Sequence, residues 1–150
     1  MSDLKKELYS QCLNYVQERM DAAQQAIDEA QRASNDDTKS SAGDKYETGR
    51  EMMQQETNRN IGQLTEANKL KIALNKINPD AITDKAGAGS LVITNKGNFY
   101  VAVSAGILKA NNETYFAISP GSPVGLRLNG QIAGGEFKLN DKIYQIKQVI

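Results

Sequence analysis

The side chains best suited to chemistry in this chain are acidic residues gathered around one polar stretch. Asp36, Asp37 and Asp44 lie within residues 34–44, which are rich in Asn, Asp, Ser, Thr and Gly, and Glu47 follows. Such residues compete for backbone hydrogen bonds in turn conformations, so we expect the chain to turn here. Taken alone, these acids indicate a solvated turn, in which each carboxylate near the start of the next helix stabilises it by about 0.3–1 kcal/mol.

Most other common catalytic side chains are missing. The chain has no histidine and a single cysteine, Cys12, which excludes zinc fingers, Cys–His nucleophiles, Ser–His triads and a disulfide framework. Cys12 falls within an apolar helical stripe, where we interpret it as a small buried hydrophobe. Basic and acidic residues number 18 each, and both halves are close to neutral, which argues against tight non-specific binding to DNA or RNA.

The chain is expected to be cytoplasmic. It contains no run of about 18 apolar residues, the length that a membrane-spanning helix needs. Its first residues lead directly into an amphipathic pattern, without the basic start, apolar middle and cleavage site of a signal peptide. We therefore expect no membrane partner.

Two long helices are predicted to carry the polar stretch between them. The first half has no proline before Pro79 and is rich in the helix formers Ala, Gln, Glu, Lys and Met. A first apolar stripe recurs at spacings of four and three: Leu4, Leu8, Cys12, Val16, Met20, Ala23, Ile27 and Ala30. A second has heptad spacing, with four apolar residues beside it: Tyr46, Met53, Asn60, Ala67 and Leu74, then Ile61, Leu64, Leu70 and Ile77. These stripes predict two helices of about 30 residues each, packed as an antiparallel coiled coil.

Two residues weaken the seam of this predicted coiled coil. Asn60 occupies a core-type position, and Gly49 lies near the turn. Buried polar residues at such positions often fix the register of a coiled coil, at a cost in stability. Met53, at heptad spacing, is interpreted as a core residue that fills gaps. Asn78 and Pro79 end the helical pattern, so the helical hairpin is expected to span residues 1–78.

After Pro79 the apolar period changes from helical to two, which predicts strands. Residues 90–94 and 99–103 flank a hairpin turn, 114–118 form a third strand, and 136–139 and 143–146 form a second hairpin. Ser122 is expected to cap a short helix that begins at Pro123 and is closed by Gly130. The chain is therefore predicted to be α+β: the helical hairpin, then a small antiparallel β domain over residues 79–150 with one short helix.

The order of these parts resembles the Gre family of bacterial transcript-cleavage factors over nearly the whole chain, which suggests a divergent member. Residues 36–51 look like the tip of that family's hairpin, an Asp-x-x-Glu turn followed by a Tyr-x-x-x-Arg-Glu helix start. Residues 118–130, with Ser122-Pro-Val-Gly125 at their centre, look like the SPxG segment of the family's FKBP-like C-terminal domain. The predicted hairpin from Gly134 to Ile146 then follows, as it does in that family.

The resemblance implies a partner, bacterial RNA polymerase. The C-terminal domain would dock on the rim of the polymerase's secondary channel, with Pro120, Ser122, Pro123 and Gly125 in the docking surface. The coiled coil would enter the channel and meet the RNA 3′ end only there. The protein would not be an enzyme itself, because the nucleolytic chemistry would remain the polymerase's own.

The resemblance also assigns a role to the acidic tip. Its carboxylates, Asp37 and Asp44 first and Asp36 and Glu47 beside them, would help to hold the second catalytic Mg²⁺ of the polymerase. Magnesium prefers hard oxygen ligands, and a weakly held ion in a two-metal site needs only one or two added carboxylates. No tightly bound cofactor and no stable metal site are expected in the free protein.

The tip departs from the family pattern at one position. When Asp37 is aligned with the family's first acidic residue, Ser40 stands where a glutamate is expected. The turn is also two residues longer before Tyr46, which places Asp44 where a second carboxylate could reach the tip. Three neighbours have two interpretations each: Lys45 and Arg50 either touch the polymerase or balance local charge, and Tyr46 either packs against the first helix or contacts the RNA end.

Two other functions stay open at this point. Because Ser40 stands where a glutamate is expected, the protein could instead be a non-cleaving relative that occupies the same channel and regulates the polymerase. A coiled-coil adaptor unrelated to transcription is the third reading, since polar core positions can direct pairing between chains. A prolyl-isomerase reading of the FKBP-like resemblance is disfavoured, because no tryptophan is present for a pocket floor. We expect a monomer.

Overall fold

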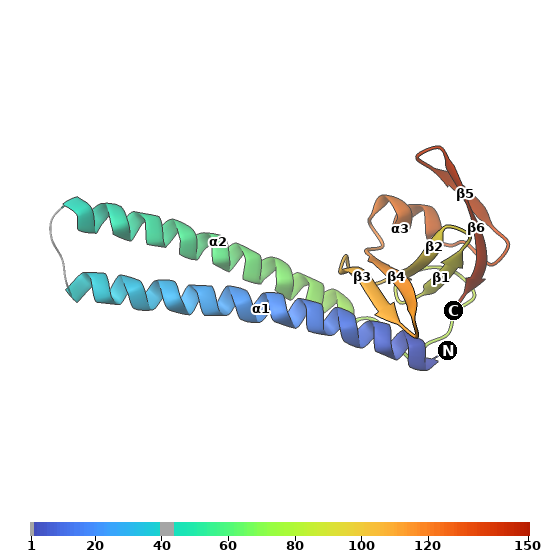
Figure 1. Cartoon of the computed structure of the whole chain (residues 1–150), viewed down its shortest axis with the longest axis horizontal. Helices are drawn as coiled ribbons and strands as arrows, with labels where there is room; N and C mark the ends of the chain where they lie inside the picture. Colours follow the sequence, from blue (N-terminus) through green and yellow to red (C-terminus); the bar gives the residue numbers. More distant parts are fainter. Residues whose placement is uncertain (1, 40–43) are drawn as a thin grey trace. The chain divides into compact units, whose positions relative to one another are not determined.

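The computed structural model describes residues 2–39 and 44–150, with side chains described for residues 3–33, 49 and 51–150. Its elements follow the order predicted for an α+β chain (Figure 1). Helices α1 and α2 come first, and six strands with one short helix follow: α1 (Ser2–Lys39), α2 (Asp44–Asn75), β1 (Leu91–Thr94), β2 (Gly97–Val101), β3 (Gly106–Ala110), β4 (Glu113–Ile118), α3 (Pro123–Leu128), β5 (Glu136–Leu139) and β6 (Lys142–Val149).

These elements form two compact units, each described by itself. One unit is Val16–Leu70, and the other combines Met1–Tyr15 with Lys71–Ile150. The predicted domain boundary between residues 78 and 79 stays a prediction. No helix in the described part of the chain is long and apolar enough to cross a membrane.

In the unit Val16–Leu70, α1 and α2 lie side by side and run in opposite directions (Figure 1). The two predicted apolar stripes account for most of the buried side chains of the two helices: Leu8, Cys12, Val16, Ala23 and Ile27 on α1, and Asn60, Ala67 and Leu74 on α2. Leu4, Met20 and Ala30 are half-buried, as are Met53, Leu64 and Leu70. The expectation of two long amphipathic helices is confirmed, whereas their coiled-coil geometry stays a prediction.

Two details of the helices differ from the expectation. Helix α1 continues through Lys39, although the turn was predicted to begin at residue 34. Once a helix has formed, each added residue gains a hydrogen bond, so weak helix formers at its end are carried along. Ile61, expected beside the seam, is 47% exposed, because it lies about 100° around the helix from the buried Asn60.

The strands form a mixed sheet in the order β3-β4-β2-β1-β6-β5. The predicted antiparallel sheet is wrong in one pairing: β2 and β4 are parallel, with Phe99 opposite Phe116. This happens because the β3–β4 hairpin contacts β2 through its second strand and not its first. The two predicted hairpins, β1–β2 and β5–β6, are confirmed by their antiparallel registers.

Strand β3 was not expected from the sequence. It is an edge strand with mostly exposed side chains, so its alternation of buried and exposed residues is weak. A usable signal follows it, because Asn111 and Asn112 have φ values of 52° and 64° and join β3 to β4. Two consecutive residues of positive φ make a type I′ hairpin turn, for which asparagine is favoured.

The core of the sheet lies under α3. Leu128 of this helix is fully buried, and it belongs to the same cluster as Val92 of β1, Val101 of β2 and Ile146 of β6. Val124, one turn earlier on α3, packs against the cluster. The short helix therefore covers one face of a sheet that buries little by itself.

The first turns of α1 are tied to the sheet unit by polar contacts. The Nζ of Lys5, which is almost fully buried, donates hydrogen bonds to the backbone oxygens of Ala81 at 2.6 Å and Ile150 at 3.1 Å. The hydroxyl of Tyr9 donates to the backbone oxygen of Leu74 at 2.8 Å. Burial lowers the pKa of Lys5, and backbone carbonyls solvate its ammonium group in place of water. These bonds fix the start of α1 within this unit.

Candidate functional site

In the sequence, the acids predicted at the hairpin tip fall at the end of α1 and at the start of α2. Asp36 and Asp37 belong to the last turn of α1, and Asp44 and Glu47 belong to the first turn of α2. The side chains of these four, and of Lys45, Tyr46 and Arg50, lie outside the described residues, and so does Ser40 entirely. The backbone therefore places the acids on helix ends, and their mutual geometry stays a prediction.

The two pairs of acids have opposite energetic consequences. A carboxylate in the first turn of a helix is stabilising by about 0.3–1 kcal/mol, so Asp44 and Glu47 are accounted for by α2 alone. In the last turn the same charge opposes the helix dipole. Asp36 and Asp37 stand there, in the last turn of α1. Helix stability thus explains half of the acidic tip and leaves Asp36 and Asp37 unexplained.

The second predicted site, the SPxG segment, is a capped helix start. The Oγ of Ser122 accepts a hydrogen bond from the Gly125 amide at 3.1 Å and donates one to the Ser119 carbonyl at 2.7 Å. Pro123 occupies the first helical turn, and Gly130 follows the helix with a φ of +80°. The predicted cap and the predicted closing glycine are both confirmed.

Gly125 is required by close packing within this segment. A Cβ atom built there would lie 2.8 Å from the carbonyl oxygen of Pro120 and would also overlap the carbonyl oxygen of Ser119. Both atoms belong to the backbone, so neither can move aside cheaply. The segment joins Pro120, Ser122, Pro123 and Gly125 in one rigid turn, and their docking role stays a prediction.

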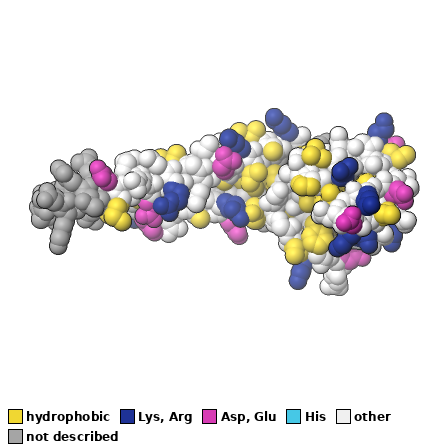
Figure 2. All heavy atoms as spheres, turned by 90° about the horizontal axis from the view of Figure 1, so that it is seen from above, with side chains coloured by type: hydrophobic (Ala, Val, Ile, Leu, Met, Phe, Trp, Pro, Cys, Tyr) yellow, Lys and Arg dark blue, Asp and Glu magenta, His cyan; other side chains and the backbone are white. Residues whose placement is uncertain are grey.

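An exposed apolar side chain stands next to this turn. Leu126 on α3 is 67% exposed, although its neighbours Gly125 and Leu128 are buried. Figure 2 shows one face of the molecule, on which hydrophobic and charged side chains are interspersed. A large exposed leucine beside a rigid turn is suited to contact with another protein. The sequence pattern did not single out this residue.

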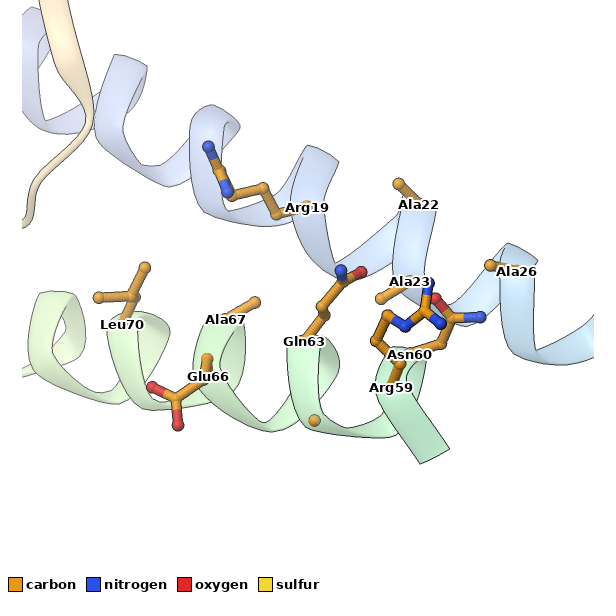
Figure 3. Close-up of a pocket in the computed structure, with 11 residues that line it drawn as sticks. Arg19, Ala22, Ala23, Ala26, Arg59, Asn60, Gln63, Glu66, Ala67 and Leu70 are labelled. Atoms are coloured by element: carbon orange, nitrogen blue, oxygen red, sulfur yellow. The ribbon is translucent and has the colours of Figure 1, made fainter. Parts of the chain in front are cut away.

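The unit Val16–Leu70 contains a groove that the sequence did not predict. It has a volume of about 730 Å³ and lies between α1 and α2 (Figure 3). Its α1 wall combines three small side chains, Ala22, Ala23 and Ala26, with Arg19, and its α2 wall includes Arg59, Asn60 and Glu66. The sequence feature that could have predicted this groove is a set of alanines on α1 opposite a polar residue on α2.

Asn60 lies in this groove and has unmet hydrogen-bonding capacity. It is 8% exposed, which confirms its predicted place at a buried position. Among the described residues, its amide nitrogen has no hydrogen-bond partner. Leaving such a donor buried and unsatisfied costs about 1–3 kcal/mol.

Cys12 is confirmed as a buried residue. Burial raises the pKa of its thiol to about 12. Tyr100, near Cys12 and Tyr9, is also fully buried, and its pKa is raised chiefly by burial and then by those two neighbours. Only the thiolate is nucleophilic, so a thiol with such a pKa is protected at neutral pH.

Alkylation of Cys12 provides a direct test of this burial. At pH 8 a thiol of pKa about 12 is ionised in roughly one molecule in ten thousand. We expect iodoacetamide to label the native protein about a thousandfold more slowly than the chain unfolded in urea, because the unfolded thiol has a pKa of about 8.5. Mass spectrometry over time gives both rates, and the chain's single cysteine makes the assignment certain. Comparable rates for the two states would contradict the buried position.

Among the described side chains, no group of three or more His, Cys, Asp or Glu residues could hold a metal ion. The side chains of the tip lie outside that part of the chain. Comparison of the chain with protein-family models, with curated proteins and with solved structures returned no match.

Proposed function

We propose that the protein is a Gre-like transcription factor that stimulates bacterial RNA polymerase to cleave backtracked RNA. In this proposal the helices α1 and α2 form a coiled coil that enters the secondary channel. Asp37 and Asp44 contribute carboxylates to the second Mg²⁺ of the polymerase, with Asp36 and Glu47 nearby. The polymerase performs the hydrolysis, so the protein has no catalytic residues of its own.

The observation that carries the proposal is the place of Asp36 and Asp37 at the end of α1. Acids in that position are unfavourable for the helix, whereas acids at the start of α2 are favourable. Helix stability does not account for acids at the end of α1, whereas a tip that lends carboxylates to a metal ion does account for them.

The C-terminal half supports the same proposal through its rigid surface turn. In the Gre-like reading, the mixed sheet with α3 is the FKBP-like domain, and the turn through Pro120, Ser122 and Gly125 docks on the channel rim. The capped helix start holds this turn in one conformation. Leu126, exposed beside it, supplies the apolar contact that a docking surface needs.

A second function, a non-cleaving regulator of the same channel, is favoured by one observation. Ser40 stands where the family pattern has a glutamate, so the pair of carboxylates depends on Asp44 in its place. If Asp44 does not reach the ion, the protein would occupy the channel without supporting cleavage. Both functions share polymerase binding, which distinguishes them from the adaptor.

Polymerase binding is tested with a surface variant that leaves the fold intact. We expect the wild-type protein to elute with purified RNA polymerase in size-exclusion chromatography. We expect Leu126→Glu to weaken binding by about tenfold or more, because it places a charge in an apolar contact. Leu126 is exposed, so the variant should unfold at the wild-type temperature.

The matched control for this experiment is Ile143→Glu. Ile143 on β6 is also exposed, at 52%, and it lies outside the turn and α3. It should leave polymerase binding unchanged. Failure of the wild-type protein to bind polymerase would contradict both channel functions and favour the adaptor. Equal losses for the two variants would contradict docking through α3.

A further inference from the structure

One flank of the helix pair in the unit Val16–Leu70 is unusually small. Ala22 and Ala26 of α1 (Figure 3) and Gly62 of α2 contribute almost no side-chain volume to the groove, although the longer side chains of Arg19 and Gln63 also line it. A Cβ atom added to Gly62 would meet nothing within 4 Å, so packing within this chain does not require a glycine there. A glycine in the interior of a helix is destabilising. Its place on this flank is explained if the backbone of another helix comes close at that point.

A second feature of the groove is the unused hydrogen-bond donor of Asn60. This side chain is 8% exposed, lines the groove and has an amide nitrogen without a partner among the described residues. The last torsion angle of an asparagine side chain is soft, so a small rotation can turn the amide nitrogen toward the groove. An oxygen atom that enters the groove beside Arg59 would supply a partner for this nitrogen.

The charges on α2 indicate which molecule supplies that oxygen. Arg59 and Glu66 both line the groove and both are exposed, seven residues apart or about 10 Å along the helix. Midway between them are Gly62 and Gln63. A two-fold axis at this point would set Arg59 of each copy opposite Glu66 of the other, with the glycines where the helices cross. A patch that complements itself in this way is what a two-fold interface requires.

The carboxylate of Glu66 is available for such a contact. Within the chain it accepts a hydrogen bond from Lys69 at 3.1 Å, and the two side chains are 72% and 67% exposed. Exposed ion pairs on a helix are weak, so the carboxylate can leave this lysine at little cost. In the groove of a second copy its two oxygens could accept from the Arg59 guanidinium and the Asn60 amide together.

We propose that two copies of this chain associate through this groove, with α2 packed antiparallel on α2 and Glu66 of each copy bound between Arg59 and Asn60 of the other. The occupant is a second copy, because Arg59 and Glu66 complement each other about a two-fold axis, while Arg19 lines the groove from α1 and is not part of this pair. The inference does not rest on the proposed function. It revises the expectation of a monomer, and it predicts that association and channel entry compete for the same helix pair.

The experiment is a charge exchange followed by sedimentation equilibrium from micromolar to millimolar protein. The wild-type mass should rise from one chain toward two as concentration increases. Arg59→Glu and Glu66→Arg should each weaken the dimer by at least about tenfold, because each sets like charges against one another. The two substitutions together should restore most of the association. Asp21→Arg, the same charge change on an exposed residue of α1 outside the groove, should leave it unchanged.

A further variant separates loss of the interface from loss of the fold. Gly62→Leu replaces a poor helix former with a good one, so it should raise the unfolding temperature of the monomer. The same side chain would hold the two helices apart and should abolish the dimer. A wild-type protein that stays monomeric at all concentrations would overturn the proposal. So would a dimer that neither single charge change weakens, or one that tolerates Gly62→Leu.

Discussion

Replacing Asp37 and Asp44 together by alanine is expected to abolish stimulated transcript cleavage while leaving polymerase binding unchanged. Each lost carboxylate should reduce cleavage by about 10–100-fold, the range seen when groups that support a metal ion are removed. The two residues lie on opposite sides of the turn, at the end of α1 and the start of α2. The effect should therefore grow from the single variants to the double variant, because each side supplies one ligand.

The matched control for the tip variant is Asp21→Ala with Asp28→Ala. Both residues lie on α1 away from its ends, and their removal changes the net charge by the same amount. This control should cleave as well as the wild type. The stability of the single tip variants gives a second readout, since removing Asp37 should stabilise α1 and removing Asp44 should destabilise α2, each by about 0.3–1 kcal/mol. Unchanged cleavage by the tip variant would show that these carboxylates are not ligands.

Gly125→Ala is expected to destabilise the sheet unit. Its Cβ would lie 2.8 Å from the Pro120 carbonyl oxygen and overlap that of Ser119. Overpacking against fixed backbone costs about 1–3 kcal/mol, and here the Ser122 cap and the buried Leu128 would be displaced with it. Urea unfolding followed by circular dichroism measures this loss. Polymerase binding should fall as well, because the docking turn loses its fixed conformation.

The control for Gly125→Ala lies four residues earlier in the same segment. Gly121 has no atom within 4 Å of an added Cβ, and its φ is not in the left-handed region. Gly121→Ala should therefore change the free energy of unfolding by no more than about 0.5 kcal/mol. Equal stabilities for the two variants would mean that the close packing at Gly125 is relaxed by small shifts of the turn.

Features set by neighbouring residues in the sequence were predicted well. The burial of Leu8, Val16 and Ile27 follows from helical spacing alone. The cap at Ser122 follows from a serine before a proline, and the turn at Asn140 and Asp141, with φ values of 53° and 64°, follows from residues that tolerate positive φ. In each case the decisive interaction lies within a few residues, so the local pattern carries the information.

Features that depend on distant contacts were missed. Lys5 is buried because carbonyl oxygens 76 and 145 residues away surround its ammonium group, and nothing near Lys5 in the sequence indicates them. The parallel pairing of β2 with β4 depends on which strand of the β3–β4 hairpin lies beside β2. Edge strand β3 has too few buried side chains to give a strand pattern in the sequence. The sequence also could not predict that the Asn60 amide nitrogen has no hydrogen-bond partner among the described residues, because residues of both helices surround it.

The residues of the candidate site also include some that the sequence predicted and others that it did not. Residue types and spacing single out the tip acids, and the helix bounds add that Asp36 and Asp37 end α1 while Asp44 and Glu47 begin α2. The SPxG segment was predicted as a capped helix, and the structure adds the reason why its glycine cannot be replaced. Leu126 and the groove beside Asn60 required the packed structure, since exposure and hollows follow from neighbours that the sequence does not bring together.

The central claim is tested most directly by adding the purified wild-type protein to backtracked RNA polymerase elongation complexes in the presence of Mg²⁺. The RNA is labelled at its 5′ end, and its length is followed on a sequencing gel. If the protein is a Gre-like factor, the transcripts should shorten from the 3′ end faster than they do in complexes without the protein. Elongation should then resume when nucleotides are added. Transcripts that stay at full length with saturating protein and Mg²⁺ would contradict it.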